Sequence, residues 1–172
     1  VEESEASLFG EIDRRLDLTT KNEIFIFIHG YANDFSEGAF KLAELWHFLG
    51  REGVPLLFSW PAGRGGPTGY AYDIESGNFC LFHLKELLRL LARHEEVEAI
   101  HIIAHSRGTD VLSSAVRELA LVARAREIEL PDEFRDSHII LAAPDLDMDV
   151  VSQRIVAEQL APIIGLDADG QC

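Results

Sequence analysis

Four short, nearly continuous runs of apolar residues alternate along the chain with longer segments of helical periodicity. The runs are rich in β-branched or aromatic residues and span residues 23–28, 54–60, 99–104 and 138–143. Runs of this length without polar alternation are typical of strands that are buried on both faces, as in a parallel sheet. No hairpin signal separates them, which disfavours a sandwich or ferredoxin-like fold.

Three of the intervening segments predict helices. Ser36 is expected to cap a helix that runs to about residue 47, with Gly50 as its stop signal. Asp73 is expected to cap a second helix with a leucine-rich apolar stripe, and a third helix covers about 107–125. This alternation predicts the α/β class: a parallel sheet with helices on both faces, in three layers.

The ends of the chain are less regular. Residues 1–7 are acidic and are expected to be loose, whereas residues 8–16 form a short helix or part of an edge strand. A helix-like segment covers about 149–164. The Gly-rich stretch at 61–69 is expected to be a mobile rim of the site.

The composition of the chain disfavours several classes of function. The chain has 172 residues, enough for one domain, and a formal net charge of −15, which disfavours nucleic-acid and anionic-membrane partners. No apolar run approaches the roughly 20 residues of a membrane helix, and two cysteines are too few for a disulfide scaffold. Because the chain begins with Val1, we expect a processed N-terminus. A cytoplasmic location is favoured, and an exported form stays open.

The sharpest chemical signal follows the third predicted strand. The stretch Ala104-His105-Ser106-Arg107-Gly108 places a serine between small residues at a strand-to-helix turn, which is the pattern of a nucleophile elbow. The tight turn needs small residues two positions before and after the serine, and the helix N-terminus favours developing negative charge. The alternative is a serine that only caps the helix. We predict that Ser106 is the catalytic nucleophile.

The loop after the first predicted strand supports this prediction. An HG-type loop at this place supplies one oxyanion-hole N–H in lipases and esterases, here from Tyr31, and the second donor is then Arg107 N–H. His29, Gly30 and His105 are expected to line the pocket. The alternative for Gly30 is a strand-end turn with a special backbone angle.

The acids after the fourth predicted strand have two expected roles. Asp145 is the predicted site carboxylate, which orients and stabilises a catalytic imidazolium. Asp147 or Asp149 is expected to cap the next helix.

No cofactor and no metal are predicted. The Gly-rich loop GRGGPTG lacks the G-K-[ST] ending of a phosphate loop, and no strand ends in G-x-G-x-x-G. No pair among the seven histidines has the spacing of a helical zinc motif.

Five blocks of the sequence together resemble those of a known protein family. They are IFIFIHGYANDF, LLFSWPAG, AYDIES, IHIIAHSRGTDVL and IILAAPDLDMDVV. In order and spacing they resemble the HGYN-, FSWPS-, AHSMG- and APDID-like blocks of a mainly bacterial family of α/β hydrolases of unknown function. The resemblance spans residues 23–151 and implies a serine hydrolase without naming its substrate. Arg107 stands where that family usually has Met, which leaves the backbone donor intact.

The resemblance also implies two further strands, which carry another Asp and then the catalytic His. The chain ends at Cys172, and no histidine follows His138. We therefore expect a single domain, residues 1–172, that is incomplete at its C-terminus. The alternatives are a natural inactive short form and a base supplied by His29 or by a partner chain.

Two functions stay open at this point. We favour a serine hydrolase that uses Ser106 on a small-molecule ester, thioester or amide, with a general-base histidine that is not evident in this chain. The alternative is a catalytically inactive hydrolase-fold module that binds a ligand or a partner. The sequence does not specify the oligomeric state.

Overall fold

One parallel sheet organises the molecule. The computed structural model describes residues 2–62, 67–126 and 137–153. Its strands are β1 (Glu23–Ile28), β2 (Val54–Phe58), β3 (Ala99–His105) and β4 (Ile139–Ala142), all parallel, in the order β2-β1-β3-β4. All four predicted strands are confirmed, with ends shifted by up to two residues.

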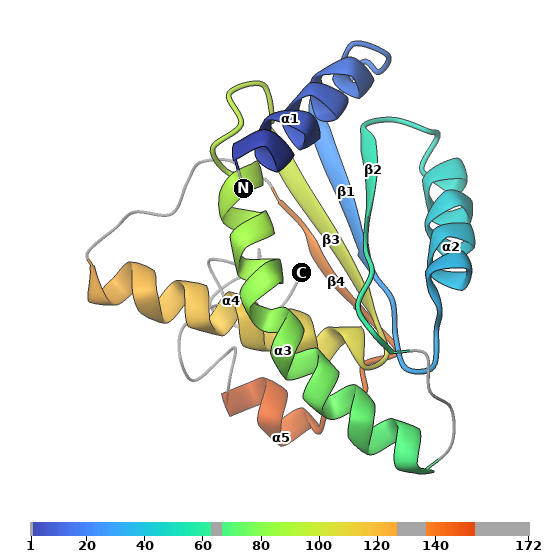
Figure 1. Cartoon of the computed structure of the whole chain (residues 1–172), viewed down its shortest axis with the longest axis vertical. Coiled ribbons are helices and arrows are strands. Elements are labelled where there is room, and N and C mark those ends of the chain that lie inside the picture. The colour runs from blue at the N-terminus through green and yellow to red at the C-terminus, as the bar shows by residue number, and fades with distance from the viewer. Residues whose placement is uncertain (1, 63–66, 127–136, 154–172) are drawn as a thin grey trace.

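Helices cover both faces of this sheet. They are α1 (Glu2–Leu16), α2 (Phe35–Phe48), α3 (Pro67–Leu91), α4 (Gly108–Ala125) and the single turn α5 (Met148–Val151). Figure 1 shows α1, α3 and α4 across one face and α2 on the other. The predicted three-layer α/β architecture is therefore confirmed.

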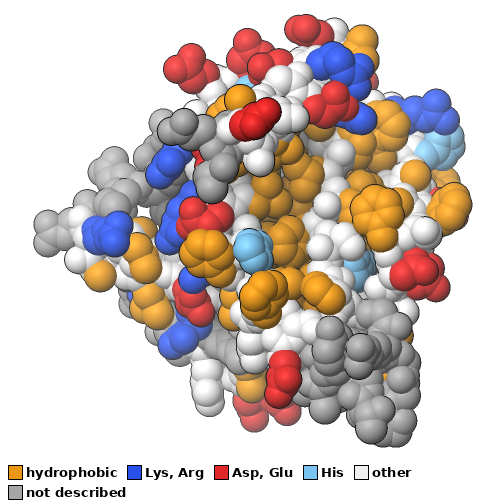
Figure 2. All heavy atoms as spheres, viewed as in Figure 1, with side chains coloured by type: hydrophobic (Ala, Val, Ile, Leu, Met, Phe, Trp, Pro, Cys, Tyr) orange, Lys and Arg blue, Asp and Glu red, His pale blue; other side chains and the backbone are white. Residues whose placement is uncertain are grey.

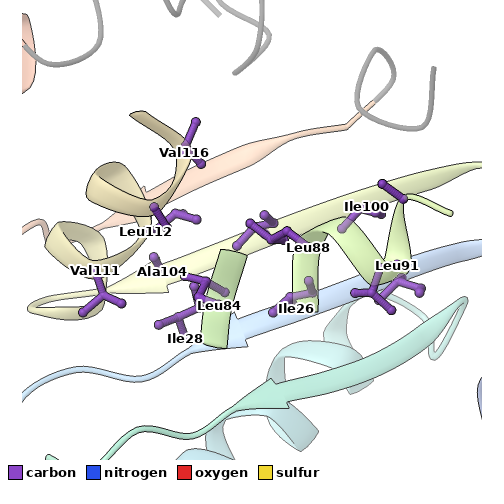
Figure 3. Close-up of a cluster of buried hydrophobic side chains, with 14 of the residues drawn as sticks. Ile26, Ile28, Leu84, Leu88, Leu91, Ile100, Ala104, Val111, Leu112 and Val116 are labelled. Carbon is purple, nitrogen blue, oxygen red and sulfur yellow. The ribbon is translucent and has the colours of Figure 1, made fainter. Parts of the chain in front are cut away.

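Alternate side chains of β1 enter different layers, because successive residues of a strand point to opposite faces. Ile24, Ile26 and Ile28 are fully buried in the core that Figure 3 shows. That core also contains apolar residues of α3 and α4, among them Leu84, Leu88, Leu91, Val111 and Leu112. On the α2 face, Phe25 and Phe27 help to line an open apolar groove of about 210 Å³.

The N-terminal helix was not expected at its full length. Residues 2–7, predicted to be loose, are the first turns of α1, and residues 8–16 are helical rather than part of a strand. Burial of Ile12 and Leu16 in the core holds the helix to the sheet. Glu11 pairs with Arg14 and Arg15, which lower the pKa of its carboxyl to about 2. Acidic side chains crowd the part of the surface where α1 lies (Figure 2).

The start of α2 corrects the predicted cap. Asp34, not Ser36, is the N-cap residue, and its side chain accepts a hydrogen bond from the N–H of Glu37 at 2.9 Å. The Glu37 carboxylate accepts one in return from the N–H of Asp34 at 3.0 Å, which completes a capping box. Gly50 follows the helix with a φ of 82°, so the predicted stop signal is confirmed.

The boundaries of two other helices also differ from expectation. Asp73 lies inside α3 and does not cap it, because the helix begins at Pro67, a residue suited to a first helical position. The end of the predicted 61–69 loop is therefore helical, and residues 63–66 lie outside the described part. The predicted 149–164 helix starts one residue early as α5, and its stretch from 154 onward lies outside the described residues.

Candidate functional site

Ser106 occupies a strained turn between β3 and α4. Its φ is 51°, in the left-handed region that costs a residue with a side chain about 1–2 kcal/mol. Backbone hydrogen bonds hold it there: Ser106 N–H donates to the carbonyl of Ala142 at 3.0 Å. The Ser106 carbonyl accepts from the Thr109 N–H at 3.0 Å and from the Thr109 hydroxyl at 2.6 Å. The predicted elbow geometry at the carboxyl edge of the sheet is confirmed.

Two glycines let other backbone segments approach this elbow. A Cβ on Gly108 would lie 2.6 Å from the carbonyl oxygen of His29 and 2.8 Å from that of Ile28. A Cβ on Gly30 would lie 2.8 Å from Ser106 Cβ and 3.0 Å from His105 Nδ1. Gly108 of the predicted pattern and Gly30 of the loop after β1 are therefore needed for close packing between the end of β1 and the elbow.

His29 lies beneath the loop after β1 and is completely buried. Its Nε2 accepts a hydrogen bond from the N–H of Trp60 at 3.1 Å, so the proton resides on Nδ1, which donates to the carbonyl of Gly30 at 3.1 Å. The Trp60 indole N–H donates to the His29 carbonyl at 2.8 Å, and the two rings stack. Because both ring nitrogens are engaged, His29 has none left to act as a base on Ser106.

His105 lies closer to the reacting position. Its Nδ1 is buried and has no hydrogen-bond partner among the described residues. Burial, and next the positive charge of Lys41, lower the pKa of His105 below its ordinary value. The imidazole is therefore neutral near pH 7.

Of the acids after β4, Asp147 serves the following helix, whereas the predicted catalytic role of Asp145 stays a prediction. Asp147 Oδ1 accepts from the N–H of Asp149 at 2.8 Å at the start of α5, so the prediction of Asp147 as a cap is confirmed. Asp145 is exposed, and its N–H donates to the Ser106 carbonyl at 3.3 Å. The structure thus brings the backbone of Asp145 to the elbow.

The loop after β1 is held by a contact that the sequence did not indicate. Ala32, between Tyr31 and Asn33, has a φ of 50°. Lys41 lies on α2, eight positions after Asn33, and its ammonium donates to Asn33 Oδ1 at 2.9 Å. No motif spacing in the sequence predicts this contact between Lys41 and Asn33. On the other side of the elbow, the Arg107 side chain pairs with Asp110 at 3.0 Å.

The described residues lack a hydrogen-bond partner for the Ser106 hydroxyl, a metal site and a membrane-spanning helix. In that part of the chain, no side chain hydrogen-bonds the Ser106 hydroxyl. No group of three or more ligating side chains able to hold a metal ion occurs in residues 2–62, 67–126 and 137–153. Nor does any helix in these ranges have the length and hydropathy needed to cross a bilayer.

Comparison with known proteins matches the chain to one family. The model of an α/β hydrolase family of unknown function, DUF900, matches residues 4–162, which is most of the chain. The chain belongs to this α/β hydrolase family. The searches of curated proteins and of solved structures gave no match.

Membership of this α/β hydrolase family agrees with the order of the strands and with the elbow at Ser106. It also agrees with the resemblance inferred from the sequence blocks. The family description names no substrate and no catalytic residue. The activity therefore has to be argued from the site itself.

Proposed function

We propose that this α/β hydrolase cleaves an ester, thioester or amide, with Ser106 Oγ as the nucleophile. The observation that carries the proposal is the positive φ of Ser106 at the turn from β3 to α4. Residues held in this backbone region cluster at functional sites, and a nucleophile elbow is the function that this strand-turn-helix context supports. A serine that only capped α4 would gain nothing from the strain.

The proposed reaction proceeds through an acyl-enzyme. Ser106 Oγ attacks the carbonyl carbon of the substrate while its proton passes to a general base, and the N–H groups of Tyr31 and Arg107 stabilise the oxyanion. Collapse of this intermediate expels the alcohol, thiol or amine, which takes up the proton. Water then attacks the acyl-enzyme by the reverse route and releases the acid. Asp145 is the proposed carboxylate that orients the base.

Two observations favour the second candidate, an inactive hydrolase-fold module. Both ring nitrogens of His29 are engaged, and the described residues supply no hydrogen-bond partner for the Ser106 hydroxyl. A serine without a base is a weak nucleophile. The oxyanion hole and binding alone leave about 10³- to 10⁴-fold catalysis over water.

A fluorophosphonate probe tests the proposal, because it labels serines activated for nucleophilic attack. We expect labelling of the parent at Ser106, none of Ser106→Ala, and undiminished labelling of Ser36→Ala, which removes an exposed serine on α2. We also expect the parent and Ser36→Ala to hydrolyse p-nitrophenyl esters, and Ser106→Ala to show no such hydrolysis. Absence of labelling at Ser106 in the folded parent would refute the hydrolase and favour the inactive module.

A further inference from the structure

Lys41 is a half-buried cation that pairs with no carboxylate of the described residues. Its one hydrogen bond within the described residues goes to the neutral side-chain amide of Asn33, at 2.9 Å. Other half-buried cations are neutralised: Lys85 pairs with Glu118, and Arg107 pairs with Asp110. Partial burial of a charge costs free energy that an anionic partner offsets.

The local fold explains why Glu37 does not pair with Lys41. Glu37 lies one helical turn before Lys41 on α2, a spacing at which Glu and Lys commonly pair. Its carboxylate instead turns back to the N–H of Asp34, and the Asp34 carboxylate accepts from the N–H of Glu37. The capping box thus engages Asp34 and Glu37, and the Lys41 ammonium donates to Asn33 in the loop after β1.

This arrangement leaves unused donors at the loop after β1, which packs against the elbow through Gly30. The Lys41 ammonium has three N–H groups and uses one of them on Asn33, and the amide NH₂ of Asn33 has no partner in the described residues. Lys41 acts electrostatically on His105. His105 Nδ1 and Ser106 Cβ both lie within 3.0 Å of the point where Gly30 would carry a Cβ. Lys41 and Asn33 are thus linked to the elbow through the loop after β1, whose Gly30 packs against Ser106.

We propose that Lys41 and Asn33 bind a carboxylate group of the substrate, so that the enzyme prefers esters that carry a free carboxylate over neutral esters of the same shape. The inference rests on the proposed function, since it assigns the group to the substrate of Ser106. A carboxylate offers two oxygens, which match one ammonium and one amide donor. The chain carries a net charge of −15, so its overall field repels anions and the attraction must be local.

Binding is the first test, and it does not depend on catalysis. Monomethyl succinate and methyl butyrate differ only by a carboxylate in place of a methyl group. We expect the parent, titrated by NMR at 0.15 M salt, to bind monomethyl succinate about tenfold more tightly. Lys41→Met should bring the ratio of the two affinities to about one, and Lys41→Arg should retain the preference.

Two further variants separate the subsite from folding and overall charge. Asn33→Asp supplies Lys41 with an internal carboxylate, so it should also abolish the preference. Lys85→Met changes the net charge as Lys41→Met does, but it removes a lysine that pairs with Glu118 on α4, and should leave the ratio unchanged. Equal binding of the two esters by the parent would overturn the inference, as would an unchanged ratio in folded Lys41→Met and Asn33→Asp.

Release of methanol from the same two esters links the subsite to Ser106. We expect faster release from monomethyl succinate in the parent and none above background in Ser106→Ala. Ser106-dependent release from both esters at equal rates would refute the inference alone. Preferential binding without Ser106-dependent release would refute the proposed function, and with it the assignment of the carboxylate to a substrate.

Discussion

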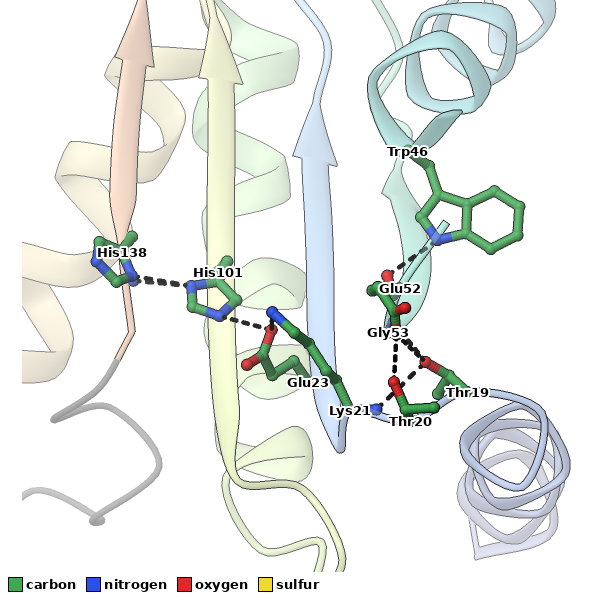
Figure 4. A network of polar contacts seen from close by, with 9 residues as sticks. All are labelled: Thr19, Thr20, Lys21, Glu23, Trp46, Glu52, Gly53, His101 and His138. Atoms are coloured by element: carbon green, nitrogen blue, oxygen red, sulfur yellow. Dashed lines mark hydrogen bonds and ion pairs between the residues drawn. The ribbon is translucent and has the colours of Figure 1, made fainter. Parts of the chain in front are cut away.

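His101 Nδ1 accepts a hydrogen bond from the backbone N–H of His138 at 3.2 Å, and so fixes the residue that precedes β4 (Figure 4). Because Nδ1 is the acceptor, the ring proton lies on Nε2, which faces the Glu23 carboxylate at 3.5 Å. The ring also stacks on Phe25 and lies against His138, whose Nδ1 is 3.2 Å from its own. Protonation of His101 would remove this acceptor.

The first prediction concerns the pH dependence of stability. Burial chiefly lowers the pKa of His101; the Glu23 carboxylate opposes this, and His138 adds to it. The unfolded chain then binds more protons, so the contribution of His101 is complete above about pH 6.5 and is lost as the pH falls through its native pKa. We expect His101→Asn, which keeps an acceptor but cannot titrate, to flatten the fall in unfolding free energy between about pH 7.5 and pH 5.

Urea unfolding across this range measures the effect. His83→Asn, at an exposed histidine of α3, is the control and should keep the parental slope. A His101→Asn variant with the parental slope would show that His101 does not couple protonation to folding.

The second prediction concerns the close approach of α4 to β1. Gly108→Ala places a Cβ within 2.8 Å of two backbone carbonyl oxygens, so the helix must shift. We expect a loss of about 1–3 kcal/mol of unfolding free energy. Gly10→Ala in α1, where a Cβ would meet no atom within 4 Å, should instead gain about 0.5–1 kcal/mol. Equal effects of the two substitutions in urea unfolding would contradict this packing.

The third prediction concerns the strain at Ser106. Glycine adopts a φ of 51° without cost, whereas alanine retains the penalty. Ser106→Gly should therefore be more stable than Ser106→Ala by about 1 kcal/mol, although neither has a nucleophile. If Ser106→Ala proved the more stable of the two in urea unfolding, the turn at position 106 would not be strained.

The strands and the elbow could be predicted because their signals are local. Continuous apolar runs are enough to mark strands that are buried on both faces, and a serine between small residues marks a tight turn. The order of these elements then brought the loops after β1, β3 and β4 to one edge of the sheet. Sequence reasoning therefore found Ser106, Gly30 and Asp145 together.

The contacts that were missed depend on side chains that meet only after folding. Glu37 is engaged by the helix cap and Lys41 donates to Asn33, and no pattern in the sequence predicts these pairings. The engagement of His29 by Trp60 likewise joins residues from two strand ends. The full length of α1 was missed because tertiary burial of Ile12 and Leu16 outweighs its acidic composition.

The last prediction distinguishes the cap that the structure shows from the one that the sequence suggested. Asp34→Ala removes the acceptor for the Glu37 N–H at the start of α2, and should cost about 1 kcal/mol of unfolding free energy. Asp34→Ser should restore most of this, since serine caps nearly as well. Ser36→Ala, at the residue first expected to be the cap, should change stability by less than about 0.5 kcal/mol, because Ser36 is exposed within the helix. Urea unfolding of the three variants decides between the residues. A loss in Ser36→Ala as large as that in Asp34→Ala would mean that α2 begins later than Phe35, and the explanation for why Glu37 does not pair with Lys41 would fail with it.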